Sequence, residues 1–486
     1  MRVSEYVGFD AVGLAELVAR GEVTPAELEE AARAAVRAVD PRVNAVVETW
    51  PADDEPGPAS GPLGGVPFLI KDIGVAMAGR RTELGSRLAA GHVADADSYV
   101  MRRFRRAGLV TFGRTATPEL ANSITTEPAP HGPTRNPWDP GLSAGGSSGG
   151  AAAAVAAGAV PVAHATDAAG SLRIPAAYTG LFGLKPTRGR VSMGPGADEV
   201  LSGLAVQGSV SRTVRDSAVL LDRMRGPEPG DPYAAPQPSR PYAEEVGRRP
   251  GPLRVGVLAQ GWGGRRTAAP VAEALDRTVR LLTSLGHRVE EVEAETSAGL
   301  GVGWEEFVLA CARLSTVNLT ALIDGLAAAT GRPVDTSTLE QETLAGYRYG
   351  QRVSGAEFAA ALGMRNRVAR SLARDFDSYD VLLTPTLPEL PMRLGAYAEG
   401  GEALDGLGWI ERLTDRSPFT LPFNVAGTPA MSVPVTADPA TGLPVGMQFA
   451  AGHGREDLLF RLAGQLEEAS PWSGRTPGVW AGTADA

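Results

Sequence analysis

Two serine-containing segments and one lysine in this sequence have the residue types that covalent catalysis needs. Ser147 and Ser148 lie in the run AGGSSGG, and Ser171 follows a glycine in the run TDAAGS. A serine hydroxyl becomes a strong nucleophile only when a neighbouring base removes its proton. Lys71 ends the apolar run VPFLI, where burial lowers the pKa of an amine toward neutral pH. These residues suggest attack of a serine on a carbonyl carbon.

The use of lysine in the chain adds weight to Lys71. Only two of the 46 basic residues are lysines, Lys71 and Lys185, and the others are arginines. Arginine stays protonated near neutral pH, whereas a buried lysine can lose its proton. GC-rich coding explains Lys185 equally well, but Lys71 also ends a predicted buried strand.

The run around Ser147 and Ser148 is open to other interpretations. It lacks the Gly-Lys-Ser/Thr ending of a phosphate-binding loop, and taken alone it has the composition of a flexible linker. Residues 146–150 match the G-x-S-x-G nucleophile elbow, centred on Ser148, but that motif needs a strand before it and WDPGLSA indicates a loop. Three later histidines are available as the base of such an elbow: His164, His287 and His453.

The segment with Ser171 argues against a linker. It follows a predicted strand at residues 160–165, and a glycine directly precedes the serine. Successive backbone N–H groups from Ala168 to Ser171 can converge on one point, which is what the stabilisation of a carbonyl oxyanion requires.

The elements that must position these residues alternate between strands and helices. We predict strands at residues 66–70, 109–112 and 160–165 and a helix at residues 150–158, and the rest of the chain alternates in the same way. This order predicts an α/β fold, a mixed central β-sheet flanked by helices, with a helical insertion near residues 270–370.

Composition narrows the choice of partners and compartment. The net charge of −10 argues against nucleic acid as a partner. The longest apolar stretch, residues 149–163, is shorter than the roughly 20 residues of a membrane span, so no membrane is expected. The single cysteine, Cys311, cannot form an internal disulfide, which favours a cytoplasmic protein. No pair of histidines has metal-ligand spacing, so neither a metal nor another cofactor is expected.

The chain resembles the amidase signature family. The segments that carry this resemblance are GGVPFLIKD, GGSSGG, TDAAGSLRIPAA, GLKPTRGRVS and, near the end, TPAMSVPV and GLPVGMQFAA. Their order and spacing make the resemblance specific, and they extend over nearly the whole chain. It implies one amidase domain over residues 1–486, with a signature core at about 60–225, a variable insertion at about 225–375 and completion of the sheet at about 376–486.

The resemblance also implies a role for each matching residue. Ser171 corresponds to the nucleophile and Lys71 to the general base. Ser147 corresponds to a bridging serine that follows a cis peptide bond. The implied oxyanion hole consists of the backbone at Ala168, Ala169, Gly170 and Ser171, and the expected supporting residues are Gly146, Ser148, Asp167 and Arg173.

One motif departs from the common family pattern. Many members have Asp-Thr-Gly-Gly-Ser where this chain has DAAGS, so that Ala168 replaces a threonine and Ala169 a glycine. The DAAGS form resembles a subgroup that includes the 6-aminohexanoate cyclic-dimer hydrolases. In this interpretation Cys311 lines the substrate pocket, although it equally fits a small buried residue on a helix. Asn122, in the run TPELANSITTEP, is a second candidate for the pocket wall.

The resemblance implies hydrolysis of a carboxamide C–N bond through an acyl-enzyme on Ser171, without a cofactor. The expected partner is a small linear, aryl or cyclic amide, such as a 6-aminohexanoate oligomer. Two alternatives stay open: a glutamine amidotransferase subunit that releases ammonia for a partner protein, and a catalytically inactive binding scaffold. The sequence also leaves open whether the chain forms a homodimer.

Overall fold

A mixed β-sheet forms the centre of the computed structural model, which describes residues 1–51, 61–292 and 299–483. In the described residues this is an 11-stranded sheet. From one edge to the other its strands are β1 (Val46–Thr49), β3 (Val110–Thr115), β2 (Pro67–Lys71), β4 (Val162–Asp167), β6 (Val206–Ser211), β5 (Phe182–Lys185), β10 (Ala430–Ala437), β11 (Pro444–Ala451), β9 (Val381–Pro385), β7 (Arg254–Val257) and β8 (Arg288–Glu291).

Both strand directions occur in this sheet. Strand β2 pairs in parallel with β3 and β4, and β7 pairs in parallel with β8 and β9. The strands between these two groups pair antiparallel, from β4 and β6 through β5 and β10 to β11 and β9. Every residue of β2, β3 and β9 is buried, because helices cover both faces of the sheet. The predicted mixed α/β fold is confirmed.

The strands predicted around the chemical residues are present, with shifted ends. Strand β2 continues to Lys71, and β4 begins two residues later than predicted and continues to Asp167. The predicted helix at 150–158 is α5 (Gly149–Ala156). Lys71 and Asp167 therefore both stand at the carboxyl ends of strands that pair in parallel.

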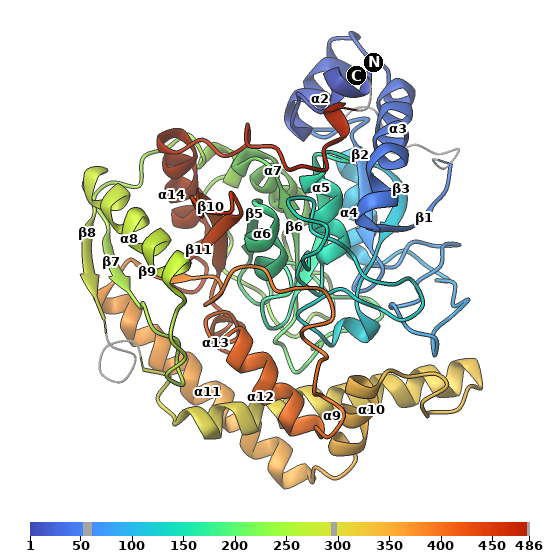
Figure 1. Cartoon of the computed structure of the whole chain (residues 1–486), viewed down its shortest axis with the longest axis vertical. Coiled ribbons are helices and arrows are strands. Elements are labelled where there is room, and N and C mark those ends of the chain that lie inside the picture. The colour runs from blue at the N-terminus through green and yellow to red at the C-terminus, as the bar shows by residue number, and fades with distance from the viewer. Residues whose placement is uncertain (52–60, 293–298, 484–486) are drawn as a thin grey trace.

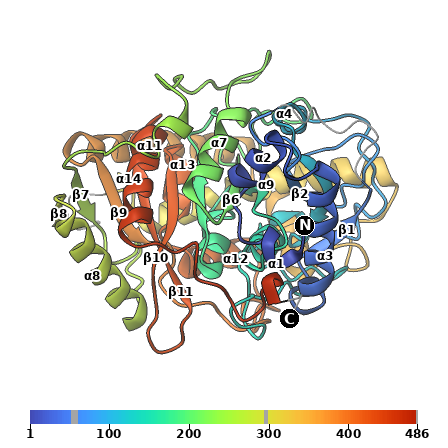
Figure 2. The same ribbon diagram turned by 90° about the horizontal axis from the view of Figure 1, so that it is seen from above.

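The N-terminal helices and the last three strands of the sheet lie at opposite ends of the molecule. Figure 2 shows strands β7, β8 and β9 at one end and the first three helices at the other. The third helix begins with a capping box between Thr24 and Glu27 and has Pro25 at its first position. These helices are α1 (Val3–Tyr6), α2 (Ala11–Ala19) and α3 (Pro25–Val43).

A group of helices packs below the sheet in Figure 1 and closes one side of the candidate site. The predicted helical insertion near residues 270–370 supplies three of them, and β8 also lies within its bounds. The group consists of α9 (Trp304–Thr330), α10 (Gln341–Gly350), α11 (Gly355–Ser378), α12 (Gly406–Arg416) and α13 (Leu421–Ala426).

Helix α9 is the one helix in the described part of the chain that is long and apolar enough to cross a membrane. Its most apolar window has a mean hydropathy of 1.4, and 50% of that window is buried inside the protein. This helix is not the longest apolar stretch of the sequence, residues 149–163, from which no membrane span is expected. Because α9 packs against α10, α11 and α12, its apolar character is that of a helix inside a protein core.

Candidate active site

Lys71 is buried at the end of β2, with 1% of its surface exposed. Its Nζ donates a hydrogen bond to Ser147 Oγ over 2.7 Å and lies 2.9 Å from Thr166 Oγ1. Burial lowers the pKa of Lys71 to about 7, although the negative charge of Asp167 acts in the opposite direction. Near neutral pH the amine is therefore neutral in a large fraction of molecules and able to accept a proton.

His164 supports the strand that carries Lys71. Its Nδ1 accepts a hydrogen bond from the backbone N–H of Lys71 over 3.3 Å, so the ring proton is on Nε2, which lies 2.7 Å from Gln207 Oε1. Burial lowers the pKa of His164 to about 4. Both ring nitrogens are occupied, and the imidazole is neutral near pH 7.

The loop that carries Ser147 is tightly held. The Gly146–Ser147 peptide bond is cis, as the family resemblance implies. A side chain at Gly146 would place its Cβ 2.5 Å from the backbone oxygen of Thr125, which explains the glycine. Thr126 Oγ1 donates to the carbonyl of Gly145 over 2.9 Å and accepts from the N–H of the first residue of α5. The loop thus presents the Ser147 hydroxyl to Lys71.

Ser148 is engaged with the backbone of a neighbouring strand. Its Oγ accepts from the N–H of Thr166 and donates to the carbonyl of the same residue, both over 3.2 Å. Neither a strand before it nor a histidine beside its hydroxyl appears among the described residues. The geometry gives no support to a nucleophile elbow centred on Ser148.

The turn that leads to Ser171 is organised by Asp167. Its carboxylate accepts hydrogen bonds from the backbone N–H groups of Gly170, Leu172 and Arg173, at 2.8, 3.3 and 3.4 Å. The N–H of Gly170 is therefore not free to hold an oxyanion, contrary to the expectation for this residue. In the described structure the backbone N–H groups of Ala168, Ala169 and Ser171 have no acceptor, and these three are available.

A buried ion pair fixes Asp167 in turn. Arg173 bonds both carboxylate oxygens over 2.9 Å, and its remaining N–H groups donate to Thr420, Asn424 and Gln448. Burial alone raises the pKa of Asp167, but the charge of Arg173 and its hydrogen bonds outweigh this effect and lower the pKa to about 2. Asp167 and Arg173 are thus structural supports of the turn.

Ala169 fits this turn without backbone strain. Its φ is not among the positive values of the described non-glycine residues, whereas Gly170 has φ 120°. The carbonyl of Ala169 accepts a hydrogen bond from Thr420 Oγ1 over 2.6 Å. Ala169, which replaces the glycine of the common family pattern, is one of the residues that line the cavity in front of Ser171.

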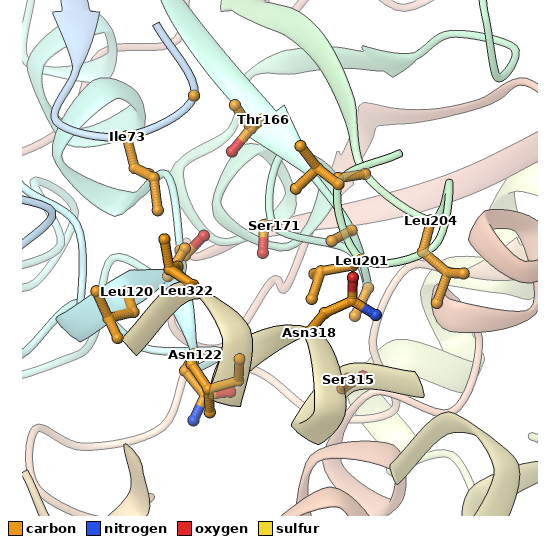
Figure 3. A pocket seen from close by; sticks show the side chains of 18 of the residues that line it. Ile73, Leu120, Asn122, Thr166, Ser171, Leu201, Leu204, Ser315, Asn318 and Leu322 are labelled. Atoms are coloured by element: carbon orange, nitrogen blue, oxygen red, sulfur yellow. The ribbon is translucent and has the colours of Figure 1, made fainter. Parts of the chain in front are cut away.

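A cavity of about 430 Å³ opens in front of Ser147 and Ser171. Figure 3 shows Ser171 at its centre, with Thr166 on one side and helix α9 on the other. Ser171 Oγ has no hydrogen-bond partner among the described residues. Asn122 and Cys311, the two predicted pocket residues, both line this cavity. Burial raises the pKa of the Cys311 thiol.

Much of the cavity wall was not anticipated from the sequence. Helix α9 contributes Ser315 and Asn318, and the segment 196–205 and helices α12 and α13 contribute further residues. Ser315 and Asn318 are three residues apart and so lie on one face of α9, but other polar residues are spread along this helix and no signal in the sequence identifies this face.

Backbone conformations rare for non-glycine residues occur in the wall as well. Leu120, Ala121 and Leu201 line the cavity with φ of 50°, 57° and 52°. Such conformations persist where the surrounding structure enforces them, and they concentrate at functional sites. Their presence here is an independent indication that this cavity is the functional one.

The comparison with known proteins agrees with this geometry. The family model described as Amidase matches residues 24–460. The chain belongs to the amidase family. Amidases hydrolyse amide C–N bonds, so the prediction of an enzyme that acts on non-peptide amides is confirmed.

Individual relatives of this amidase cover nearly its whole length. It is 41% identical over 484 residues to the 6-aminohexanoate-cyclic-dimer hydrolase of Paenarthrobacter ureafaciens, with 96% of each chain covered. A solved structure of a 6-aminohexanoate cyclic dimer hydrolase complexed with substrate matches with a TM-score of 0.91 and 39% identity, over 97% of this chain and 99% of that one. A bacterial aryl acylamidase of the amidase signature family matches with a TM-score of 0.84 and 27% identity, over 96% and 99% of the two chains.

Proposed function

We propose that the amidase hydrolyses a small amide through an acyl-enzyme on Ser171, with Ser147 as proton relay and Lys71 as general base. The observation that carries this proposal is the buried Lys71, whose pKa is about 7, bonded to Ser147 in the cavity that also exposes Ser171. A base whose pKa lies near the pH of the reaction is present largely in its neutral form and is still basic enough to accept the proton of a serine.

Acylation follows from the order of these groups. Ser171 Oγ bonds to the substrate carbonyl carbon while its proton passes to Ser147, and the proton of Ser147 passes to neutral Lys71. Lys71 then returns a proton through Ser147 to the amide nitrogen, the C–N bond breaks and the amine leaves. The unpaired Ser171 hydroxyl must turn to Ser147 when substrate fills the cavity, a tightening common in catalytic sites.

Deacylation uses the same relay in the second half of the reaction. Water bonds to the acyl carbon and its proton passes through Ser147 to Lys71. The ester bond to Ser171 breaks, Ser171 recovers a proton, and the carboxylic acid is released. In both halves of the reaction the backbone N–H groups of Ala168, Ala169 and Ser171 hold the oxyanion. Such electrostatic stabilisation is usually the largest single contribution to the rate enhancement.

The cavity supports a mainly apolar substrate. Its lining combines aliphatic side chains with a few polar groups, the usual pattern of a small-molecule site. Because two relatives carry the name of 6-aminohexanoate cyclic-dimer hydrolase, we propose cyclic and linear amides of medium-length amino acids as the first substrates to test.

A glutamine amidotransferase role has less support. Glutamine carries an α-carboxylate, which binding sites usually pair with an arginine or lysine. None of the described residues that line the cavity is cationic, whereas Asp198 and Glu199 are acidic. We therefore propose a free-standing amidase that acts without a partner protein.

The test is a comparison of purified wild type and Ser171→Ala. We expect the wild type alone to hydrolyse p-nitroacetanilide and 6-aminohexanoate cyclic dimer, and a fluorophosphonate to label only the wild type, at Ser171. Labelling without hydrolysis of any amide would favour a partner-dependent amidotransferase. The absence of both labelling and hydrolysis would favour an inactive binding scaffold.

A further inference from the structure

Asn318 has an unusual position in the cavity wall. It lies on α9, across the cavity from Ser171 (Figure 3). Its Nδ2 donates one hydrogen bond to the carbonyl of Leu314 over 2.8 Å and a second to Ser202 Oγ over 2.9 Å. A carbonyl oxygen only accepts, so the bond to Leu314 fixes which end of the amide is nitrogen. Both N–H groups of Asn318 are therefore occupied.

The oxygen of the same amide is the atom left for a ligand. Asn318 Oδ1 accepts no hydrogen bond in the described structure, and it is not among the buried polar atoms that lack a partner. It is therefore accessible from the cavity that Asn318 lines. An acceptor in a mostly apolar wall selects for a ligand that brings a donor, because an unmatched polar group loses its water without compensation.

This acceptor is held in place from two sides. Ser202, which accepts the hydrogen bond from Asn318, has a backbone φ of 56°. Its carbonyl accepts a hydrogen bond from Arg365 of α11, which fixes the backbone at this residue. The carbonyl of Gly203 accepts from Arg188. The hydrogen bond between Asn318 and Ser202 therefore connects α9 to a segment whose backbone is itself held by two arginines. This arrangement preorganises Asn318 Oδ1 toward the cavity.

The charges around the cavity point in the same direction. The described lining includes the carboxylates of Asp198 and Glu199 and no lysine, arginine or histidine. The carboxylate of Glu199 accepts a hydrogen bond from the hydroxyl of Tyr233 and forms an ion pair with Arg365 over 3.8 Å. Asp198 is exposed. A ligand with a distal carboxylate would meet like charge there, whereas a neutral N–H donor would not.

We infer that Asn318 is a specificity-determining residue that accepts a hydrogen bond from a second amide N–H, remote from the bond that is cleaved. The preferred substrate class is then a diamide without a negative charge at its far end. This inference rests on the proposed function, because it assigns the distal part of a substrate whose scissile carbonyl lies at Ser171.

The test uses chromogenic substrates whose cleaved bond is known. The p-nitroanilide of N-acetyl-6-aminohexanoic acid carries a distal amide N–H, and its analogue with a methyl group on that distal nitrogen does not. For the wild type we expect methylation to lower kcat/KM by roughly 3- to 10-fold, the effect of one neutral hydrogen bond. In Asn318→Leu the two substrates should be hydrolysed with equal kcat/KM.

Two controls separate this inference from the proposed function. The short substrate p-nitroacetanilide has no distal amide, so its hydrolysis by the wild type tests the proposed function alone. Asn366→Leu makes the same substitution on the exposed face of α11 and should leave all three substrates unaffected. No hydrolysis of any substrate by the wild type would overturn the proposed function itself.

The inference is overturned, with the proposed function intact, if p-nitroacetanilide is hydrolysed but distal methylation costs the wild type nothing. This comparison needs no variant and so does not depend on the folding of Asn318→Leu. An equal methylation penalty in wild type and Asn318→Leu would likewise exclude Asn318 as the acceptor.

Discussion

Lys71 Nζ lies 2.7 Å from Ser147 Oγ, and both side chains are buried. A lysine in such a place exchanges protons with the serine rather than with water. Its pKa is lowered from the ordinary value of 10.5 to about 7 because burial disfavours the charged form. The relationship turns a strongly basic side chain into a base that works at neutral pH.

The first prediction concerns the pH dependence of hydrolysis. Acylation needs neutral Lys71, and a pKa of about 7 means that the neutral fraction falls as the pH drops below that value. We expect kcat/KM to fall about tenfold per pH unit below pH 7 and to be level above it. The measurement is a pH profile of p-nitroacetanilide hydrolysis. A midpoint near 4, the pKa of His164, would instead indicate a histidine base.

Lys71→Arg provides the matched variant for this profile. Arginine keeps the positive charge but cannot lose its proton in this pH range. We expect Lys71→Arg to lack activity at every pH, and Lys71→Ala to lose roughly 10²- to 10⁴-fold, the usual contribution of a general base. Substantial activity in either variant would mean that another group removes the proton of Ser171.

The second prediction concerns the two small residues before the nucleophile. Gly170 has φ 120°, and a Cβ there would lie 2.5 Å from Thr420 Oγ1. Gly170→Ala should therefore displace the turn and lower kcat at least 10²-fold, since small displacements of a nucleophile are costly. Ala169→Gly is the control, because Ala169 needs no glycine conformation, and it should keep kcat within about 3-fold. Equal effects of the two substitutions would contradict this account.

The chemical residues were easier to predict from the sequence than the walls around them. Lys71, Ser147 and Ser171 stand in short segments whose residue types are typical of this chemistry. Lys71 ends β2, Ser171 follows β4 and Ser147 precedes α5, and all three elements are predicted from the local pattern of residues. The scarcity of lysine also carried information, since Lys71 and Lys185 are both fully buried. Burial lowers the pKa of Lys185 to about 7 as well, and its Nζ donates to the carbonyl of Pro186.

Other features depend on contacts that no local pattern contains. The N–H of Gly170 is occupied because Asp167 folds back onto its own turn. Asn318 enters the cavity because α9 crosses it from far along the chain, and Asn424 reaches Asp167 from a distance of 257 residues. Tertiary packing decides such contacts. Strands and helices predicted from local sequence patterns therefore indicate the sheet, but not which residues form the wall of the pocket.

The third prediction tests the buried pair of Asp167 and Arg173. Both side chains are fully buried, so Asp167→Ala leaves an uncompensated charge and should cost about 3–5 kcal/mol of stability. Arg249→Ala, which removes an exposed pair with Glu468, should cost no more than about 1 kcal/mol. Urea unfolding of both variants is the measurement. Equal midpoints would contradict the structural role of the buried pair.

The pH dependence of this difference has a definite sign. The pKa of Asp167 is about 2 in the folded protein, below its ordinary value of 3.8. The stabilisation is therefore complete above about pH 4 and is lost as the pH falls toward 2. The penalty of Asp167→Ala should therefore not shrink between pH 7 and pH 5, and protonation of Lys71 and Lys185, which Asp167 favours, adds to it. A penalty that shrinks already at pH 5 would mean that Asp167 is not held in its ionised form.

The fourth prediction concerns the single cysteine. Cys311 lines the cavity but is 1% exposed, and burial raises the pKa of its thiol. Because only the thiolate reacts with alkylating agents, iodoacetamide at pH 8 should leave the native protein unlabelled and should label it once in urea. Mass spectrometry of the intact protein measures both states, and Cys311→Ser should stay unlabelled in each. Rapid labelling of the native protein would show that Cys311 is an accessible thiolate rather than a buried part of the pocket wall.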